Sequence, residues 1–284
     1  MEGVDKLLNI GGSIDVRDTA QRTLLHRACE EASAATVARL LELGATVNAT
    51  EKRKQTPLHR ACERGRLDIV RLLVEKGGAD TRARAKLQHE PLHVACLGNC
   101  GEVVKFLLRE GNVDVEAADK NGMRCLHLAV RRNRLEAIRE LLKHGCDVEA
   151  PLSDGLTRPL HMACSSGYEK VATLLLDHQA DIGARGPKGY RPLHLAAKEA
   201  RAAIVELLIG RHADLHDKDD RGRDALHYAD SRRCKERIRE AHRREEKAAE
   251  AQRQLALQRK RDEAIRRREQ ELLDRIDLRS RARK

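Results

Sequence analysis

The sequence predicts an all-α solenoid of short repeated helices, followed by a long charged helix at the C-terminal end. The tetrapeptide Leu-His-x-Ala recurs seven times at intervals of 33 or 34 residues along the 284-residue chain. Aromatic residues make up 1% of the chain, too few for the deep core of a globular enzyme of this length. From Ser231 to Lys284 there is no Gly or Pro, and strong helix formers dominate.

The recurring tetrapeptide marks the first helix of each repeat. Thr56 followed by Pro57 is typical of an N-cap and a first helical residue, and Gly65 is suited to end that helix. The apolar stretch 69–74 then has the spacing of one buried face of a second helix. The seven tetrapeptides begin at Leu25, Leu58, Leu92, Leu126, Leu160, Leu193 and Leu226. This period predicts a stack of helix pairs.

The pattern closely resembles the ankyrin repeat, over about residues 3–233. The resemblance implies an ankyrin-repeat solenoid, in which helix-turn-helix repeats are joined by β-hairpin-like loops. It also implies that the His of each tetrapeptide is structural and forms hydrogen bonds within its own turn. Partners of such proteins usually dock on the concave face, which is built from the hairpin tips and the exposed ends of the first helices.

We divide the chain into three parts. Residues 1–18 look like the second half of a repeat, which either caps the solenoid or indicates that the chain is part of a longer protein. Residues 19–233 form the seven repeats, and residues 234–284 form the charged tail. Single insertions at Gly78, at Val113 and within residues 153–157 explain the 34-residue intervals, and we expect all three in hairpin loops.

The tail carries most of the positive charge. Residues 231–284 contain 20 Lys and Arg against 11 Asp and Glu, in a chain whose net charge is +11. Its basic runs, 259–261 and 266–268, fit a nuclear localisation signal, a nucleic-acid patch, an anionic-lipid contact or simply a solvated helix face. A coiled-coil heptad is traceable but sparse. Because the tail lacks an apolar stripe, we expect residues 231–284 to pack little against the repeats and to be dispensable for folding.

Nothing in the repeats predicts catalysis. Phosphate-binding glycine loops and the serine-hydrolase elbow are absent. The His and Cys of each first helix supply two ligands where zinc needs about four, so we expect no metal, cofactor or small-molecule substrate. Eight unpaired-looking Cys indicate a reducing compartment, cytoplasmic or nuclear, and no apolar run is long enough to span a membrane. The protein is therefore expected not to be an enzyme.

A basic concave surface is the expected binding site. The hairpin tips contribute Lys52, Arg53, Lys86, His89, Lys120, Met123, Lys188, Tyr190, Arg221 and Arg223, and the first helices contribute Arg64, Arg131, Arg132 and Lys198. This set predicts a protein scaffold or adaptor with an acidic partner, although exposed loops are commonly charged for solvation alone. The alternatives are nucleic-acid or anionic-membrane association through the tail, or a regulatory fragment of a larger multidomain protein.

Overall fold

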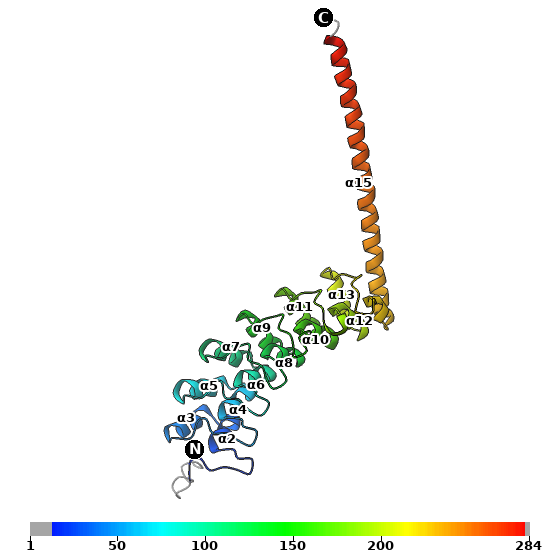
Figure 1. The fold of residues 1–284 in the computed structure, drawn as a ribbon. Coiled ribbons are helices and arrows are strands. Elements are labelled where there is room, and N and C mark those ends of the chain that lie inside the picture. The colour runs from blue at the N-terminus through cyan, green and yellow to red at the C-terminus, as the bar shows by residue number, and fades with distance from the viewer. Residues whose placement is uncertain (1–12, 282–284) are drawn as a thin grey trace.

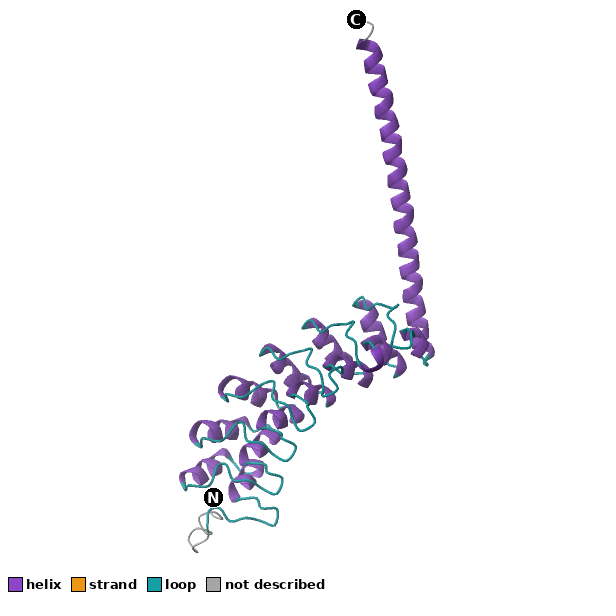
Figure 2. Ribbon diagram, in the orientation of Figure 1, coloured by secondary structure: helices purple, strands orange, loops and turns teal. Residues whose placement is uncertain are grey.

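The chain is a curved stack of helix pairs from which one long helix projects at the C-terminal end (Figure 1). The structure, a computed structural model, describes residues 13–281, with the side chains of residue 269 and residues 271–281 left out. The half repeat expected in residues 1–18 therefore lies mostly outside the described residues. In the described part the elements are helices and loops, with two isolated β-bridges at hairpin bases, so the predicted fold class is confirmed (Figure 2).

Each Leu-His-x-Ala tetrapeptide lies in or at the start of a first helix. These helices are α2 (Leu24–Glu31), α4 (Pro57–Arg64), α6 (Pro91–Gly98), α8 (Cys125–Arg131), α10 (Pro159–Ser166), α12 (Pro192–Lys198) and α14 (Ala225–Tyr228). The second helices are α3 (Ala34–Glu42), α5 (Leu67–Arg71) with its π-helical continuation η1 (Leu72–Lys76), α7 (Gly101–Glu110), α9 (Leu135–Lys143), α11 (Glu169–Asp177) and α13 (Ala202–Gly210). The short 3₁₀ turn η2 (Pro187–Gly189) lies in a hairpin loop, and α15 (Arg232–Arg281) follows α14.

The tetrapeptide histidines hold neighbouring repeats together. Nδ1 of His59 accepts a hydrogen bond from the backbone N–H of Thr56 at 3.2 Å. Its Nε2 then donates to the carbonyl of His89 in the next repeat at 3.0 Å. The imidazoles of the other repeats, up to His194, are placed in the same way. The structural role implied by the family resemblance is therefore confirmed for these residues.

The core is a thin apolar layer between first and second helices. Leu58, Cys62, Ile69 and Leu73 are fully buried in repeat two, and the other repeats bury their counterparts. All eight cysteines are free thiols: seven are buried in this core, and Cys100 packs against its edge. The first helix of repeat two ends at Gly65 in the left-handed conformation, with φ of 69°. Small residues and thiols thus replace the aromatics that a deeper core would need.

Two of the three expected insertions lie elsewhere than predicted. In repeat two the extra residue is absorbed by the π turn η1, where the N–H of Gly77 donates to the carbonyl of Leu72. In repeat three the second helix, α7, is ten residues long where α9 has nine. Only the insertion within residues 153–157 enlarges a hairpin tip. A helix end tolerates one more residue because its last carbonyls are unpaired in any case.

The expectation that residues 231–284 pack little against the repeats is wrong for the first three turns of α15. Cys234 and Ile238 are fully buried, and Ala241 is 8% exposed. Arg237 pairs with Glu206 of α13 at 2.9 Å. Beyond these turns the described side chains of α15 are almost all exposed, and the helix leaves the stack as a rod (Figure 1). No helix in the described part of the chain is long and apolar enough to cross a membrane.

Candidate functional site: the hairpin tips of repeats one to four

The first hairpin tips are linked to one another by backbone hydrogen bonds. Each bond runs from an N–H of one tip to a carbonyl of the tip before it. Lys52 donates to Ala20 at 3.2 Å, Lys86 donates to Arg53 at 2.8 Å, and Lys120 donates to Leu87 at 2.8 Å. Because the backbones are tied in this way, the side chains at the tips are carried on a surface of fixed spacing.

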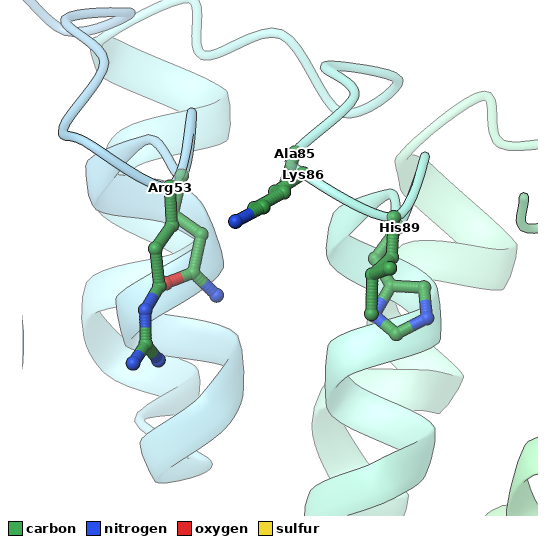
Figure 3. A pocket seen from close by; sticks show the side chains of 6 residues that line it. Arg53, Ala85, Lys86 and His89 are labelled. Atoms are coloured by element: carbon green, nitrogen blue, oxygen red, sulfur yellow. The ribbon is translucent and has the colours of Figure 1, made fainter.

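Two grooves of about 490 Å³ each flank the tip of repeat three. One is lined by Arg53, Gln55, Ala85, Lys86, Leu87 and His89. The other is lined by Lys52, Lys54, Ala85, Lys86, Leu87, Gln88 and Lys120. Figure 3 shows Lys86 reaching from its hairpin toward the hairpin that carries Arg53. The structure thus brings together five residues of the predicted site: Lys52, Arg53, Lys86, His89 and Lys120.

The cations at these tips are free. Lys52, Arg53, Lys54, Lys86 and Lys120 are all exposed, and none forms an ion pair with a side chain that the structure describes. Beside them the side chain of Leu87 is 47% exposed. The grooves therefore offer positive charge and an apolar contact side by side.

The remaining predicted residues fall into separate places. Arg132 lines a hollow of about 300 Å³ together with His89 and Leu97. Arg64 and Arg131 are exposed at the ends of their first helices, and the Nη1 atom of Arg131 lies 3.1 Å from the sulfur of Met123. Of the others, Lys198 is the last residue of α12, and the far tips carry Lys188, Tyr190, Arg221 and Arg223.

Three of the predicted contact residues are less available than expected. Met123 is 7% exposed and packs inward, so its place at a partner surface was wrongly predicted. His89 is half-buried and contacts Asp119 through Nε2 at 3.2 Å. Arg223 is held by Asp219 at 3.0 Å. Arg223 is held within its own tip and His89 contacts the next tip, so each has fewer donors to offer a partner.

Comparison with known proteins places the chain in a family. The family profile described as ankyrin repeats (3 copies) matches residues 1–85, 78–152 and 160–240, and the profile described as ankyrin repeats (many copies) matches residues 129–176. The chain belongs to the ankyrin-repeat family. A search among curated proteins gave no match.

Two solved ankyrin-repeat domains are similar to it over most of its length. The ankyrin repeat domain of Bcl-3, a member of the IkappaB protein family, aligns with a TM-score of 0.69 and 30% identity, covering 77% of this chain and 98% of that one. The human ASB11 ankyrin repeat domain aligns with a TM-score of 0.66 and 25% identity, covering 78% and 98%. The ankyrin-repeat fold is in general a protein–protein interaction module and typically non-enzymatic.

The expectation that the repeats contain no enzyme motif is wrong for one pattern. His89, Glu90 and His93 form His-Glu-x-x-His, the spacing of many zinc peptidases. In a peptidase both histidines lie on one helix, but here α6 begins only at Pro91. Both ring nitrogens of His93 are occupied, by the N–H of Glu90 at 3.2 Å and the carbonyl of Ala117 at 3.0 Å. His93 is the ankyrin histidine of repeat three, so the pattern arises from the repeat and leaves no free ligand pair.

The buried histidines and cysteines of the core are poorly suited to catalysis or metal binding. Burial lowers the pKa of His59 to about 4 and raises the pKa of Cys29 to about 12. The pKa of the Cys62 thiol is also raised by burial. A thiol that stays protonated is a weak nucleophile and a weak metal ligand. No group of three or more His, Cys, Asp or Glu side chains in the described residues is arranged to hold a metal ion.

Sequence reasoning missed three tip residues: Lys54, Ala85 and Leu87. Lys54 and Leu87 extend the grooves. Ala85 occupies the position that Asp119 holds in the next repeat. Aligning the seven copies shows the difference most clearly for Ala85: Asp18, Glu51, Asp119 and Asp219 stand at this position in other copies, although Leu152 and Gly186 also lack an acid there.

Proposed function

We propose that the chain is a non-catalytic adaptor that binds an acidic segment of another protein along the hairpin tips of repeats one to four. The observation that carries the proposal is the set of five unpaired cations around Leu87. Opposite charges would speed association and orient the partner. The exposed leucine would supply apolar contact near the centre of the site, where binding energy concentrates.

A charge-reversal experiment tests this function. The full chain, the double variant Arg53→Glu with Lys86→Glu, and the matched variant Lys188→Glu with Arg221→Glu are immobilised, and captured proteins are quantified by mass spectrometry. All four positions are exposed, so each variant should keep the wild-type melting temperature. The first variant should lose captured acidic proteins and the second should retain them. Equal losses in both variants would show that general charge, and not the grooves, drives capture.

A second candidate function rests on α15. Residues 251–260 contain three basic and no acidic residues, and every one of them is exposed on the projecting part of the helix. Such a surface suits a polyanion, either nucleic acid or an anionic membrane. Titration of a DNA duplex at increasing salt tests it: a steep loss of affinity that disappears on truncation after residue 250 supports this role, and a flat response eliminates it for DNA.

A further inference from the structure

Four hairpin tips in the described part of the chain are closed by a carboxylate of their own, three by an aspartate at the same position and the fourth by Asp154, two residues further into its loop. Oδ1 of Asp119 accepts hydrogen bonds from the backbone N–H groups of Asn121 at 2.7 Å and Met123 at 2.9 Å. Asp18 and Asp219 bind the amides two and four residues ahead in the same way, at 2.8 and 2.9 Å. In each case one side-chain oxygen satisfies two loop donors that the backbone leaves unpaired.

The tip of repeat three has the same backbone but lacks the carboxylate. The N–H of Ala85 donates to the carbonyl of His89 at 2.9 Å, and the N–H of Gln88 donates to that of Ala85 at 2.9 Å. The loop of Asp119 shows the matching bonds at 2.9 and 3.0 Å. Because alanine has no side-chain oxygen, the N–H groups of Leu87 and His89 find no acceptor among the described residues. The loop is thus preformed around two free donors.

The side chains around this position also fit a carboxylate. In repeat four the side chain of His89 contacts Asp119 from the preceding tip. Gln55, in the tip of repeat two, occupies the position relative to Ala85 that His89 occupies relative to Asp119. The Oε1 atom of Gln55 is buried without a hydrogen-bond partner. Gln55 and Ala85 line one groove together with Arg53 and Lys86. Rotation of the Gln55 amide would present its NH₂ group to an oxygen placed above Ala85.

From this geometry we propose that the space above Ala85 is a carboxylate seat. An Asp or Glu side chain from an acidic segment of a partner protein would fill it, accepting hydrogen bonds from the N–H groups of Leu87 and His89. The partner's carboxylate would then take the place of the missing tip aspartate. This assignment rests on the proposed function and specifies how the partner is recognised. Hydrogen bonds from two amides to one charged oxygen are among the stronger protein contacts.

The charges near the seat favour an anion. Three buried acids lie in the neighbouring turns. Glu51 pairs with Arg60 at 3.0 Å, Glu90 pairs with Arg84 at 3.2 Å, and Asp119 binds the amides of its own tip and the side chain of His89. The free charges that line the grooves are therefore those of the lysines and Arg53. Leu87, next to the seat, would pack against an apolar side chain adjacent to the Asp or Glu of the partner. An acidic segment with an adjacent apolar residue is thus the expected ligand.

A longer polar side chain introduced at position 85 would fill the seat and block it. Ala85→Asn places a neutral amide oxygen where Asp119 has its carboxylate, so it blocks the seat without changing the net charge; Ala85→Asp blocks it with a native-like carboxylate. Ala203→Asn changes an exposed alanine on α13 and is the matched control. The probe is a fluorescein-labelled peptide Gly-Ser-Asp-Leu-Asp-Ser-Gly, compared with the same peptide carrying Asn at both acidic positions and with a labelled thymidine oligonucleotide. Affinities for the full chain are measured by fluorescence anisotropy, and stability by thermal melting.

We expect the acidic peptide to bind the full chain more tightly than its Asn counterpart. Ala85→Asn should weaken its binding about tenfold, the cost of losing charge-assisted hydrogen bonds, and should raise the melting temperature. Ala203→Asn should do neither. Equal affinity for the two peptides overturns the seat, as does an Ala85→Asn variant that binds like the wild type or that loses only the oligonucleotide. If Arg53→Glu with Lys86→Glu abolishes capture while Ala85→Asn changes nothing, the proposed function survives without the seat.

Discussion

The hairpin tips near the two ends of the solenoid carry similar numbers of cations but use them differently. At tips one to four, five cations form no ion pair with a described side chain: Lys52, Arg53, Lys54, Lys86 and Lys120. At the far tips, Arg185 pairs with Asp220 at 2.5 Å and Arg223 pairs with Asp219 at 3.0 Å. The guanidinium of Arg223 also lies 4.5 Å from the centroid of the Tyr228 ring. The near tips thus gather five unpaired cations around two grooves, whereas at the far tips aspartates pair with Arg185 and Arg223 and leave Lys188 and Arg221 exposed.

The same contrast extends to the apolar surface. The C-terminal end is covered by the first turns of α15, whereas Leu87 remains half exposed between the N-terminal grooves. The far end therefore offers fewer clustered free charges and less apolar surface. The proposed function rests on this difference, and three predictions test how far the difference holds.

The largest effect is expected at the covered end. Ile238→Asp places a charge where the wild-type side chain is fully buried against the repeats, and should lower the free energy of unfolding by about 4 kcal/mol. Ile265→Asp changes the same residue type on the same helix, at a position that is 50% exposed, and should cost almost nothing. Urea unfolding followed by circular dichroism measures both. Similar values for the two variants would mean that α15 does not cover the end of the stack.

Acid should weaken the hydrogen bonds by which the first-helix histidines hold neighbouring repeats together. Burial lowers the pKa of His59 from its usual 6.5 to about 4, so the unfolded chain binds a proton more readily than the folded chain between these values. Stability is therefore complete above pH 6.5 and falls as the pH approaches 4, by up to about 3 kcal/mol from this one residue. Unfolding free energies at half-unit pH steps should show a shallower fall in His59→Gln than in the wild type. Parallel profiles for the two proteins would exclude His59 as a source of the acid sensitivity.

The smallest effect concerns a strained residue in repeat six. Ala200 lies between α12 and α13 with φ of 55°, where repeats two and five have Gly65 and Gly167. Ala200→Gly should raise the free energy of unfolding by about 1 kcal/mol, because glycine adopts this conformation without a steric cost. Gly145→Ala is the reverse substitution at a matched site. An added Cβ there meets nothing within 4 Å, so the only cost is that of holding an alanine at a positive φ. It should destabilise by a similar amount, and thermal melts of both variants check the pair.

Much of the architecture was predictable because it is local and repeated. The tetrapeptides place every first helix, Gly65 and Asn99 end two of them in the left-handed conformation, and the tail is helical as its composition predicts. Each of these features depends on residues close together in the chain. Repetition then supplies the long-range packing, because one repeat's neighbour is another copy of itself.

The insertions and the start of α15 were harder to predict because packing decides them. An extra residue can be accommodated at a helix end or in a loop, and in repeat two the structure places it in the π turn η1. Ile238 is one apolar residue in a strongly charged segment, and its burial depends on the open end of the stack that it meets. A pattern of charges does not reveal such a docking surface.

The sequence by itself determined the repeat, the order of the helices and the sign of the charge at the tips, since these follow from short-range conformational preferences and composition. The tertiary structure alone decided which cations are free, because Asp219 and Asp220 reach Arg223 and Arg185 only after the loops have folded. It also decided that Met123 points inward and that Ala85 leaves two loop amides unpaired beside a groove. Those outcomes depend on where neighbouring side chains end in space, which no single repeat specifies.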